Sequence, residues 1–142
     1  MRVVAWAIVV LGLVTAAPER VAAQSGQQGA EVSLGRNYPN PFNPETWIPF
    51  QVPKSAWDDG TPPVVSLRVY NVLAQLVAVP VLQASGQLLE NLTVEWNGTG
   101  NYVAYWDGKY RGTGRDAASG VYVYQLEVDG RRYPPRKMTV IK

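Results

Sequence analysis

The sequence predicts an all-β fold, an antiparallel β-sandwich, over residues 37–142. Three observations carry this prediction. Apolar and polar residues alternate with a period of two in every strand-like segment after residue 37, and no segment keeps a helical period. Gly, Asp, Asn and Pro separate these segments at short intervals, as in turns. About seven such segments in roughly 100 residues are typical of an immunoglobulin-like sandwich.

The alternation assigns one inward face to each of the clearest strands. The inward sets are Ile48, Phe50 and Val52; Val65, Leu67 and Val69; Leu92, Val94 and Trp96; and Tyr122, Tyr124, Leu126 and Val128. The other candidate strands cover residues 75–81, 102–106 and 136–141. Pro49 lies opposite the inward face of its strand and marks an edge strand or a bulge, because it cannot donate to a ladder. Asp129-Gly130 separates two strand-like runs and predicts a tight hairpin.

Residues 1–23 are typical of an export signal. Arg2 precedes an apolar run over residues 3–14, and Val21-Ala22-Ala23 supplies small residues for cleavage before Gln24. The apolar run is short for a membrane span, which needs about 20 residues. A retained membrane anchor stays the alternative, with the rest of the chain outside the cytoplasm. Residues 24–36, rich in Gln, Gly and Ser, predict a flexible linker before a single domain over residues 37–142.

Composition narrows the partners of this domain. Without Arg2, Glu19 and Arg20, 11 basic and 10 acidic residues remain, so the net charge is +1 and no basic stripe points to nucleic acid. The chain has no cysteine, although small exported domains often carry disulfides. The apolar core therefore has to supply the stability. We expect protein partners, a periplasmic, outer-membrane-surface or extracellular location, and membrane contact only through residues 1–23 if they are retained.

Catalysis is not expected. The chain has no His and no Cys, so the commonest general base and the thiol nucleophile are missing. The pair Asp58-Asp59 lies in a loop with Gly and Pro, where Asp is a turn former. The segment from Asp107 to Ser119 has acids near both ends but three cations between them, whereas a calcium site needs net negative charge. We predict no enzyme activity, no metal site and no cofactor.

A proline-rich segment, Asn37-Tyr38-Pro39-Asn40-Pro41-Phe42-Asn43-Pro44, precedes the first long strand and is called the lead-in below. Each proline fixes φ near about −65° and removes a backbone donor. Each residue before a proline is restricted to extended conformations. The lead-in is therefore neither a helix nor a central strand. We expect a stiff entry to the domain, anchored by the apolar side chains of Tyr38 and Phe42.

The lead-in is the first of several blocks that occur in a fixed order. The others are Val65-Ser66-Leu67-Arg68-Val69-Tyr70-Asn71-Val72-Leu73-Ala74-Gln75-Leu76-Val77, Trp106-Asp107-Gly108-Lys109, Ala118-Ser119-Gly120-Val121-Tyr122-Val123-Tyr124-Gln125-Leu126-Glu127 and Arg136-Lys137-Met138-Thr139-Val140-Ile141-Lys142. Together they resemble the C-terminal sorting domain of type IX secretion substrates, and equally the flagellar hook-capping-type immunoglobulin-like domain. Ala74 stands where the family pattern has glycine, so a positive φ there would be strained.

The resemblance implies an exported, non-enzymatic module that an export machinery recognises for secretion or surface attachment. The final strand is then a candidate recognition strand with Lys137, Met138, Val140 and Lys142. Its lysines also fit a purely structural role, because charged side chains on an edge strand discourage pairing with strands of other chains. The lead-in is a candidate docking segment with Tyr38, Pro39, Pro41, Phe42, Pro44 and Trp47. The alternative function is a periplasmic or membrane-anchored accessory subunit of a larger envelope complex, which docks by protein–protein contacts.

Aromatic residues leave a third possibility open. Aromatic side chains favour half-buried strand surfaces, so we assign Trp96 and Trp106 to packing. Trp47 faces outward in our register and Trp57 lies in a loop. Exposed tryptophans are frequent interface anchors. These two residues therefore leave room for a carbohydrate-binding module.

Overall fold

The computed structural model describes residues 31–142. The predicted signal peptide and linker residues 24–30 lie outside this range. The strands are β1 (Ser33–Leu34), β2 (Thr46–Gln51), β3 (Val64–Tyr70), β4 (Leu76–Ala78), β5 (Val81–Leu82), β6 (Leu92–Thr93), β7 (Asn101–Trp106), β8 (Gly120–Val128), β9 (Arg131–Arg132) and β10 (Arg136–Val140). A single 3-10 turn, η1 (Lys54–Trp57), is the one helical element of the described range. None of its helices is long and apolar enough to cross a bilayer.

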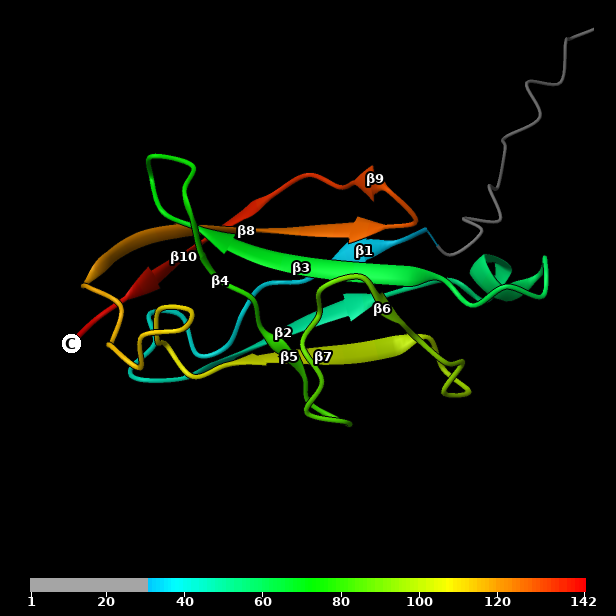
Figure 1. Ribbon diagram of the computed structural model, residues 1–142, viewed down its shortest axis with the longest axis horizontal. Coiled ribbons are helices and arrows are strands. Elements are labelled where there is room, and N and C mark those ends of the chain that lie inside the picture. Colours follow the sequence, from blue (N-terminus) through cyan, green and yellow to red (C-terminus); the bar gives the residue numbers. More distant parts are fainter. Residues whose placement is uncertain (1–30) are drawn as a thin grey trace, which may run out of the picture.

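Two antiparallel sheets face each other, which confirms the predicted all-β sandwich (Figure 1). The four-stranded sheet has the order β1-β2-β7-β5. The six-stranded sheet has the order β10-β8-β3-β4, with β6 added beside β3 and β9 beside β8. The strand prediction over residues 75–81 divides into β4 and β5, which belong to different sheets. Residues 76–81 are all apolar, so no alternation of apolar and polar residues marks the point where the chain crosses between the sheets.

The dry interior matches the inward sets for the long strands. The four-stranded sheet contributes Ile48 of β2 and Val52, which directly follows β2. The opposite sheet contributes Leu67, Val69 and Leu126. All five side chains are fully buried in one core cluster. Trp96 departs from its set because β6 ends at Thr93, which leaves Trp96 half-buried. At roughly 25 cal/mol per Å² of apolar surface, burial of this kind is the main force that stabilises a domain without disulfides.

Pro49 is neither on an edge strand nor at a bulge, contrary to the sequence prediction. It lies inside β2, paired with Val103 of β7. Its carbonyl oxygen accepts a hydrogen bond of 2.8 Å from the N–H of Gly35, so the missing proline donor points toward the short β1 side. A Cβ on Gly35 would lie 2.7 Å from the Pro49 ring. Because Gly35 has no Cβ, the segment that follows β1 can lie directly against Pro49, which has no N–H to donate.

The predicted linker is too long at its C-terminal end. Ser33 and Leu34 pair with Gln51 and Phe50, and the Leu34 side chain is buried. The Gln- and Ser-rich composition of the predicted linker concealed this pairing, since only Leu34 and the partly buried Val32 pack against the core.

The two turns singled out by the sequence behave as expected. Val128 and Arg131 pair across a two-residue loop in which Asp129 and Gly130 have φ of 50° and 80°, which confirms the hairpin. Ala74 has φ of 58°, the left-handed conformation that glycine tolerates best. The polar side chain of Asn71 holds this second turn, since its Oδ1 accepts from the N–H groups of Leu73 and Gln75, both at 3.0 Å.

Candidate functional site

The two candidate segments from opposite ends of the domain lie side by side. The N–H of Phe42 donates to the carbonyl of Thr139 at 3.0 Å, and the N–H of Ile141 donates to the carbonyl of Phe42 at 3.0 Å. These bonds form an isolated parallel bridge between Phe42 and Val140. Asn40 adds a third contact, because its Oδ1 accepts from the N–H of Thr139 at 3.0 Å. The lead-in and the C-terminal strand therefore form one surface, at the left-hand end of Figure 1.

This arrangement covers much of an exposed edge. β10 is the outermost strand of its sheet, and an uncovered edge strand pairs readily with other chains. The lead-in satisfies the outward backbone groups at positions 139 and 141. Lys137, whose side chain is exposed, lies at the next outward-facing position of the ladder. The lead-in therefore covers the edge of β10 at positions 139 and 141, and the next outward-facing position carries a positively charged side chain.

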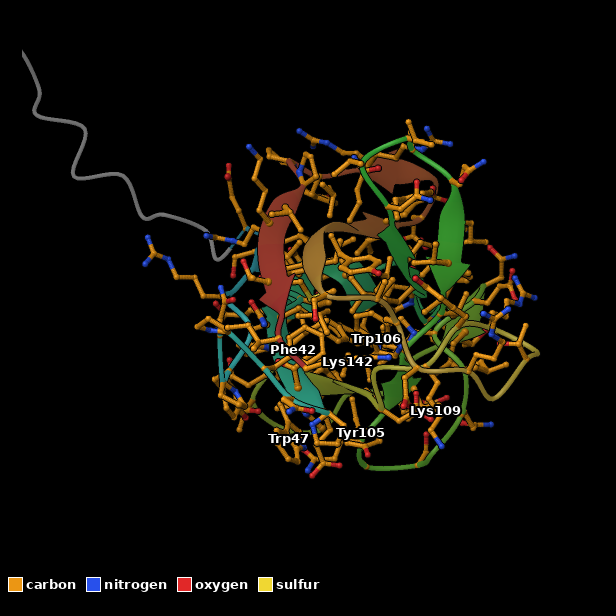
Figure 2. The ribbon with its side chains drawn as sticks, turned by 90° about the vertical axis from the view of Figure 1, so that its left-hand side faces the viewer. Phe42, Trp47, Tyr105, Trp106, Lys109 and Lys142 are labelled. Carbon is orange, nitrogen blue, oxygen red and sulfur yellow. The ribbon has the colours of Figure 1, made fainter. Side chains whose placement is uncertain are left out.

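Phe42 fixes the lead-in through an aromatic chain. It is 1% exposed, and its ring packs edge-on against Trp106 with centroids 5.4 Å apart. Trp106 in turn packs edge-on against Tyr122 of β8 at 5.8 Å. Figure 2 looks at this end of the sandwich, where Phe42, Trp106 and Lys142 are labelled close together. The predicted anchoring by Phe42 and the packing role of Trp106 are confirmed.

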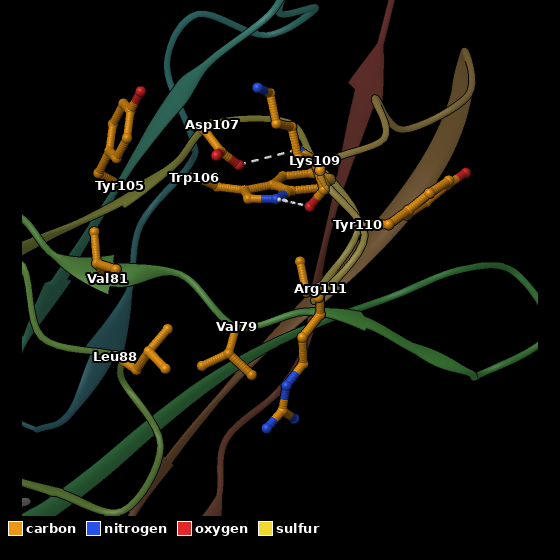
Figure 3. Close-up of a pocket in the computed structure, with 12 residues that line it drawn as sticks. Val79, Val81, Leu88, Tyr105, Trp106, Asp107, Lys109, Tyr110 and Arg111 are labelled. Atoms are coloured by element: carbon orange, nitrogen blue, oxygen red, sulfur yellow. Dashed lines mark hydrogen bonds between the residues drawn. The ribbon is translucent and has the colours of Figure 1, made fainter.

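The Trp-Asp-Gly-Lys block serves the same junction. Gly108 has φ of 73°, and a Cβ on it would lie 2.0 Å from the carbonyl oxygen of Pro44. The indole Nε1 of Trp106 donates to the carbonyl of Lys109 at 3.0 Å, and the N–H of Lys109 donates to Asp107 Oδ1 at 3.0 Å (Figure 3). The turn thus holds the tryptophan in place and leaves room for the lead-in above it.

A buried polar network secures the start of the lead-in. The hydroxyl of Tyr124 donates to the carbonyl of Gly35 at 2.8 Å and accepts from the N–H of Asn37 at 3.0 Å. Asn37 Nδ2 donates to Thr46 Oγ1 at 3.1 Å. Burial raises the pKa of the Tyr124 hydroxyl. No local pattern in the sequence identifies Asn37 and Tyr124 as partners, because 87 residues separate them.

The other predicted anchor, Tyr38, is not buried. Its side chain is 50% exposed, and its ring lies nearly parallel to that of Trp47 with centroids 6.2 Å apart. Pro39, Pro41 and Pro44 are exposed as well. The lead-in is therefore anchored at the buried residues Asn37 and Phe42, and its tyrosine and prolines are exposed to solvent.

The candidate recognition strand also has two different faces. Met138 and Val140 are 1% and 4% exposed and point into the core, so they hold the strand in place from within. Lys137 and Lys142 are exposed. The N–H of Lys142 donates to Ser119 Oγ at 3.0 Å, which fixes the last residue against the start of β8. On the surface of the folded domain, the lysines of this segment are therefore accessible and the apolar pair is not.

A tyrosine pair ties the loop over residues 107–119 to β8. The hydroxyls of Tyr110 and Tyr122 lie 3.0 Å apart, and both bond to the backbone of Ala118. The hydrogen bond between the two hydroxyls lowers the pKa of Tyr110, while burial raises the pKa of Tyr122. Lys109 bridges to Asp116 through the backbone, as in a hairpin. Within residues 31–142, no group of three or more His, Cys, Asp or Glu side chains is placed to hold a metal ion.

A groove of about 380 Å³ lies beside this loop (Figure 3). Val79, Val81 and Leu88 contribute its apolar lining, and Lys109 and Arg111 contribute cations. Arg111 is already paired with Glu90 at 3.1 Å. This ion pair is exposed, and such pairs contribute little to stability.

The two tryptophans left open by the sequence have different surroundings. Trp57 packs edge-on against Trp96 at 5.0 Å, and its Nε1 donates to the carbonyl of Val94 at 3.0 Å. Trp57 is thus a packing residue at the end of the sandwich. Trp47 lies on the outer face of the four-stranded sheet, between Tyr38 and Tyr105.

Comparison with known proteins supports the fold. No protein-family model matches the chain, and no curated protein matches it in sequence. Among solved structures, the chain is similar to dimeric latent PorU from Porphyromonas gingivalis, with a TM-score of 0.55 and 18% identity. The match covers 79% of this chain and 10% of the PorU chain. A likeness at this identity shows a shared all-β fold, carried in PorU by a small part of a much longer protein.

Proposed function

We propose that this chain is a non-enzymatic, exported module of the type IX sorting kind, which acts in secretion or surface attachment through protein–protein contacts. The ordered sequence blocks support this role, and the PorU match is in keeping with their fold. The observation that carries the proposal is the backbone pairing of Phe42 with Thr139 and Ile141, which joins the first and last blocks into one surface.

In this proposal, the export machinery binds the exposed part of that surface. Lys137 and Lys142 provide positive charge on the strand, and Pro39 and Pro41 provide a stiff neighbouring segment. Stiff segments lose little conformational entropy on binding, which favours recognition. Met138 and Val140 contribute by keeping the strand in register with β8.

Charge reversal at both lysines tests this role without removing the strand. Deletion of residues 137–142 is a poor test, because it takes two buried side chains out of the core. The double variant Lys137→Glu with Lys142→Glu keeps the core intact, and Lys54→Glu is the matched control at an exposed lysine of η1. In a host with a type IX apparatus, we expect the double variant to accumulate in the periplasm while the control reaches the surface or medium.

The result is read only for variants with unchanged thermal unfolding. Normal export of the folded double variant would contradict the recognition role of this strand. Export of the wild-type chain in the same host without its type IX apparatus would contradict the assignment to that machinery.

A second candidate function is an accessory subunit of an envelope complex. It is favoured by the turn between β3 and β4, where Val72 and Leu73 are each 74% exposed on a hydrogen-bonded frame. Two rigidly held aliphatic side chains suit a pocket on a larger assembly. Mass spectrometry of the N-terminus separates the candidates: a mature end at Gln24 supports the exported module, and an intact Met1 supports the anchored subunit.

A further inference from the structure

An uninterrupted apolar row crosses the outer face of the four-stranded sheet. Tyr38 pairs with Trp47, Trp47 with Tyr105, Tyr105 with Val81, and Val81 with Leu88. Because paired residues share a face of the sheet, five side chains from five chain segments lie in line. Figure 2 labels Trp47 and Tyr105 next to each other on this side of the molecule.

The rings of this row are held in place. Trp47 lies between Tyr38 and Tyr105, with centroids 6.2 Å and 5.6 Å away. The Tyr105 hydroxyl donates to Glu45 Oε2 at 2.6 Å, which fixes the far ring. Two backbone hydrogen bonds of 2.9 Å hold Tyr38 beside Trp47. Rings fixed before binding lose little freedom when a ligand covers them.

Unpaired polar side chains lie farther along the same face. Gln51 and Asn101 are directly opposite each other in the β2–β7 ladder. They line a shallow hollow of about 280 Å³ with Ser33, Pro49 and Val103. Across residues 31–142, neither amide side chain has a hydrogen-bond partner. Two free amides beside a row of aromatic rings combine apolar contact with neutral donors and acceptors.

The charges on this face limit the choice of ligand. Every outward side chain of the four strands is uncharged: Ser33, Trp47, Pro49, Gln51, Val81, Asn101, Val103 and Tyr105. Glu45, at the rim, is already engaged by Tyr105. The four strands themselves therefore present no charge on this face, and the cations Lys109 and Arg111 line only the groove at the Val81–Leu88 end of the row.

The size of the face limits the choice of ligand further. Five positions at about 4.8 Å per strand span roughly 19 Å, and the strands extend about 14 Å along the face, which gives an area on the order of 270 Å². A stable protein–protein interface needs about 800 Å² on each partner. A second copy of this chain or a large globular partner therefore finds too little surface here, whereas a narrow chain-like ligand is well matched.

We propose that this face binds a neutral saccharide chain. The apolar C–H face of a sugar ring stacks on an aromatic side chain, and its hydroxyls need neutral donors and acceptors. Tyr38, Trp47 and Tyr105 supply the stacking surface, and Gln51 and Asn101 supply the polar groups. This inference goes beyond the sorting role. It shares Tyr38 and Trp47 with the candidate docking segment, whereas the test of the sorting role changes only Lys137 and Lys142, so the two proposals can fail separately.

Titration of the purified full chain with defined oligosaccharides tests the proposal. The probes are neutral cello-, xylo-, manno- and chito-oligosaccharides, with an oligogalacturonate as the acidic control. We expect at least one neutral probe to bind with a dissociation constant on the order of 0.1–1 mM and to change the tryptophan fluorescence. Trp47→Phe should abolish the fluorescence change, and the matched variant Trp57→Phe should keep it.

Affinity measurements on surface variants complete the test. Tyr38→Ala and the double variant Gln51→Ala with Asn101→Ala should each weaken binding about tenfold, equivalent to about 1.4 kcal/mol. Leu73→Ala, an exposed apolar change elsewhere, should leave binding unchanged. The proposal is overturned by absence of binding to all neutral probes at millimolar concentration, by binding to the acidic probe alone, or by equal loss in Leu73→Ala. Tyr38 is half exposed, so its variant keeps the fold and the result stays interpretable.

Discussion

Replacement of Phe42 by alanine tests how strongly the lead-in is bound to the sandwich. The side chain is 1% exposed and fills the space beside Trp106, so its removal leaves a cavity against a rigid aromatic neighbour. Phe→Ala changes at such sites cost about 3–5 kcal/mol. The loss of the edge-on ring contact accounts for about 1 kcal/mol of this figure. In a domain of this size, we expect the melting temperature to fall by roughly 10–20 °C.

Urea unfolding followed by tryptophan fluorescence measures this loss directly. Tyr38→Ala is the matched control, because it removes an aromatic side chain that is half exposed in the same segment. We expect the control to lose less than about 1 kcal/mol. The m-value should stay the same in both variants, which indicates an unchanged unfolding reaction. A loss below about 1 kcal/mol for Phe42→Ala would refute the anchoring role, since a fully buried ring cannot be removed so cheaply.

Three further variants address other parts of the account. Gly108→Ala places a methyl group against the Pro44 carbonyl oxygen at a residue with positive φ. We expect it to destabilise the domain by about 3 kcal/mol or more. An unchanged urea midpoint would contradict the close approach of Gly108 to Pro44. Ala74→Gly relieves a φ of 58° and should raise the free energy of unfolding by about 0.5–1 kcal/mol, whereas a lower midpoint would show that the turn is unstrained. The hydrogen bond to Glu45 raises the pKa of Tyr105 to about 12, so the folded state keeps a proton that the unfolded chain releases above its ordinary pKa of 10.0. Stability from this group is therefore complete below pH 10 and lost between about pH 10 and 12, and Tyr105→Phe should reduce the alkaline loss in a pH series of thermal melts; an identical pH profile would contradict the linkage.

The sequence predicts the layers of this fold well because period-two alternation survives in every long strand. Ile48, Leu67 and Tyr124 are buried as expected, since one face of each strand has to meet the opposite sheet. The two-residue strands could not be predicted from the sequence. β1 and β9 have two residues each, too few for any periodicity, and backbone pairing with a longer neighbour defines them.

The site was only partly accessible from the sequence. The proline spacing identifies the lead-in, and the terminal lysines identify β10, but nothing in either segment shows that they pair with each other. Their junction depends on a backbone contact between Phe42 and Thr139, far apart in the chain and without a side-chain signature. Tyr38 was expected inside because it is large and apolar in part. Its position beside Trp47 on an outer face depends on the register of the sheet.

Amide hydrogen exchange at Phe42 and Ile141 tests the central claim most directly. The two N–H groups donate in opposite directions across the same junction, Phe42 to Thr139 and Ile141 to Phe42. We predict strong and similar protection for both amides in the wild-type protein, and a joint loss of protection in Phe42→Ala. An unprotected Phe42 amide beside a protected Ile141 amide would show that the final strand does not depend on the lead-in, and the single surface described here would not exist.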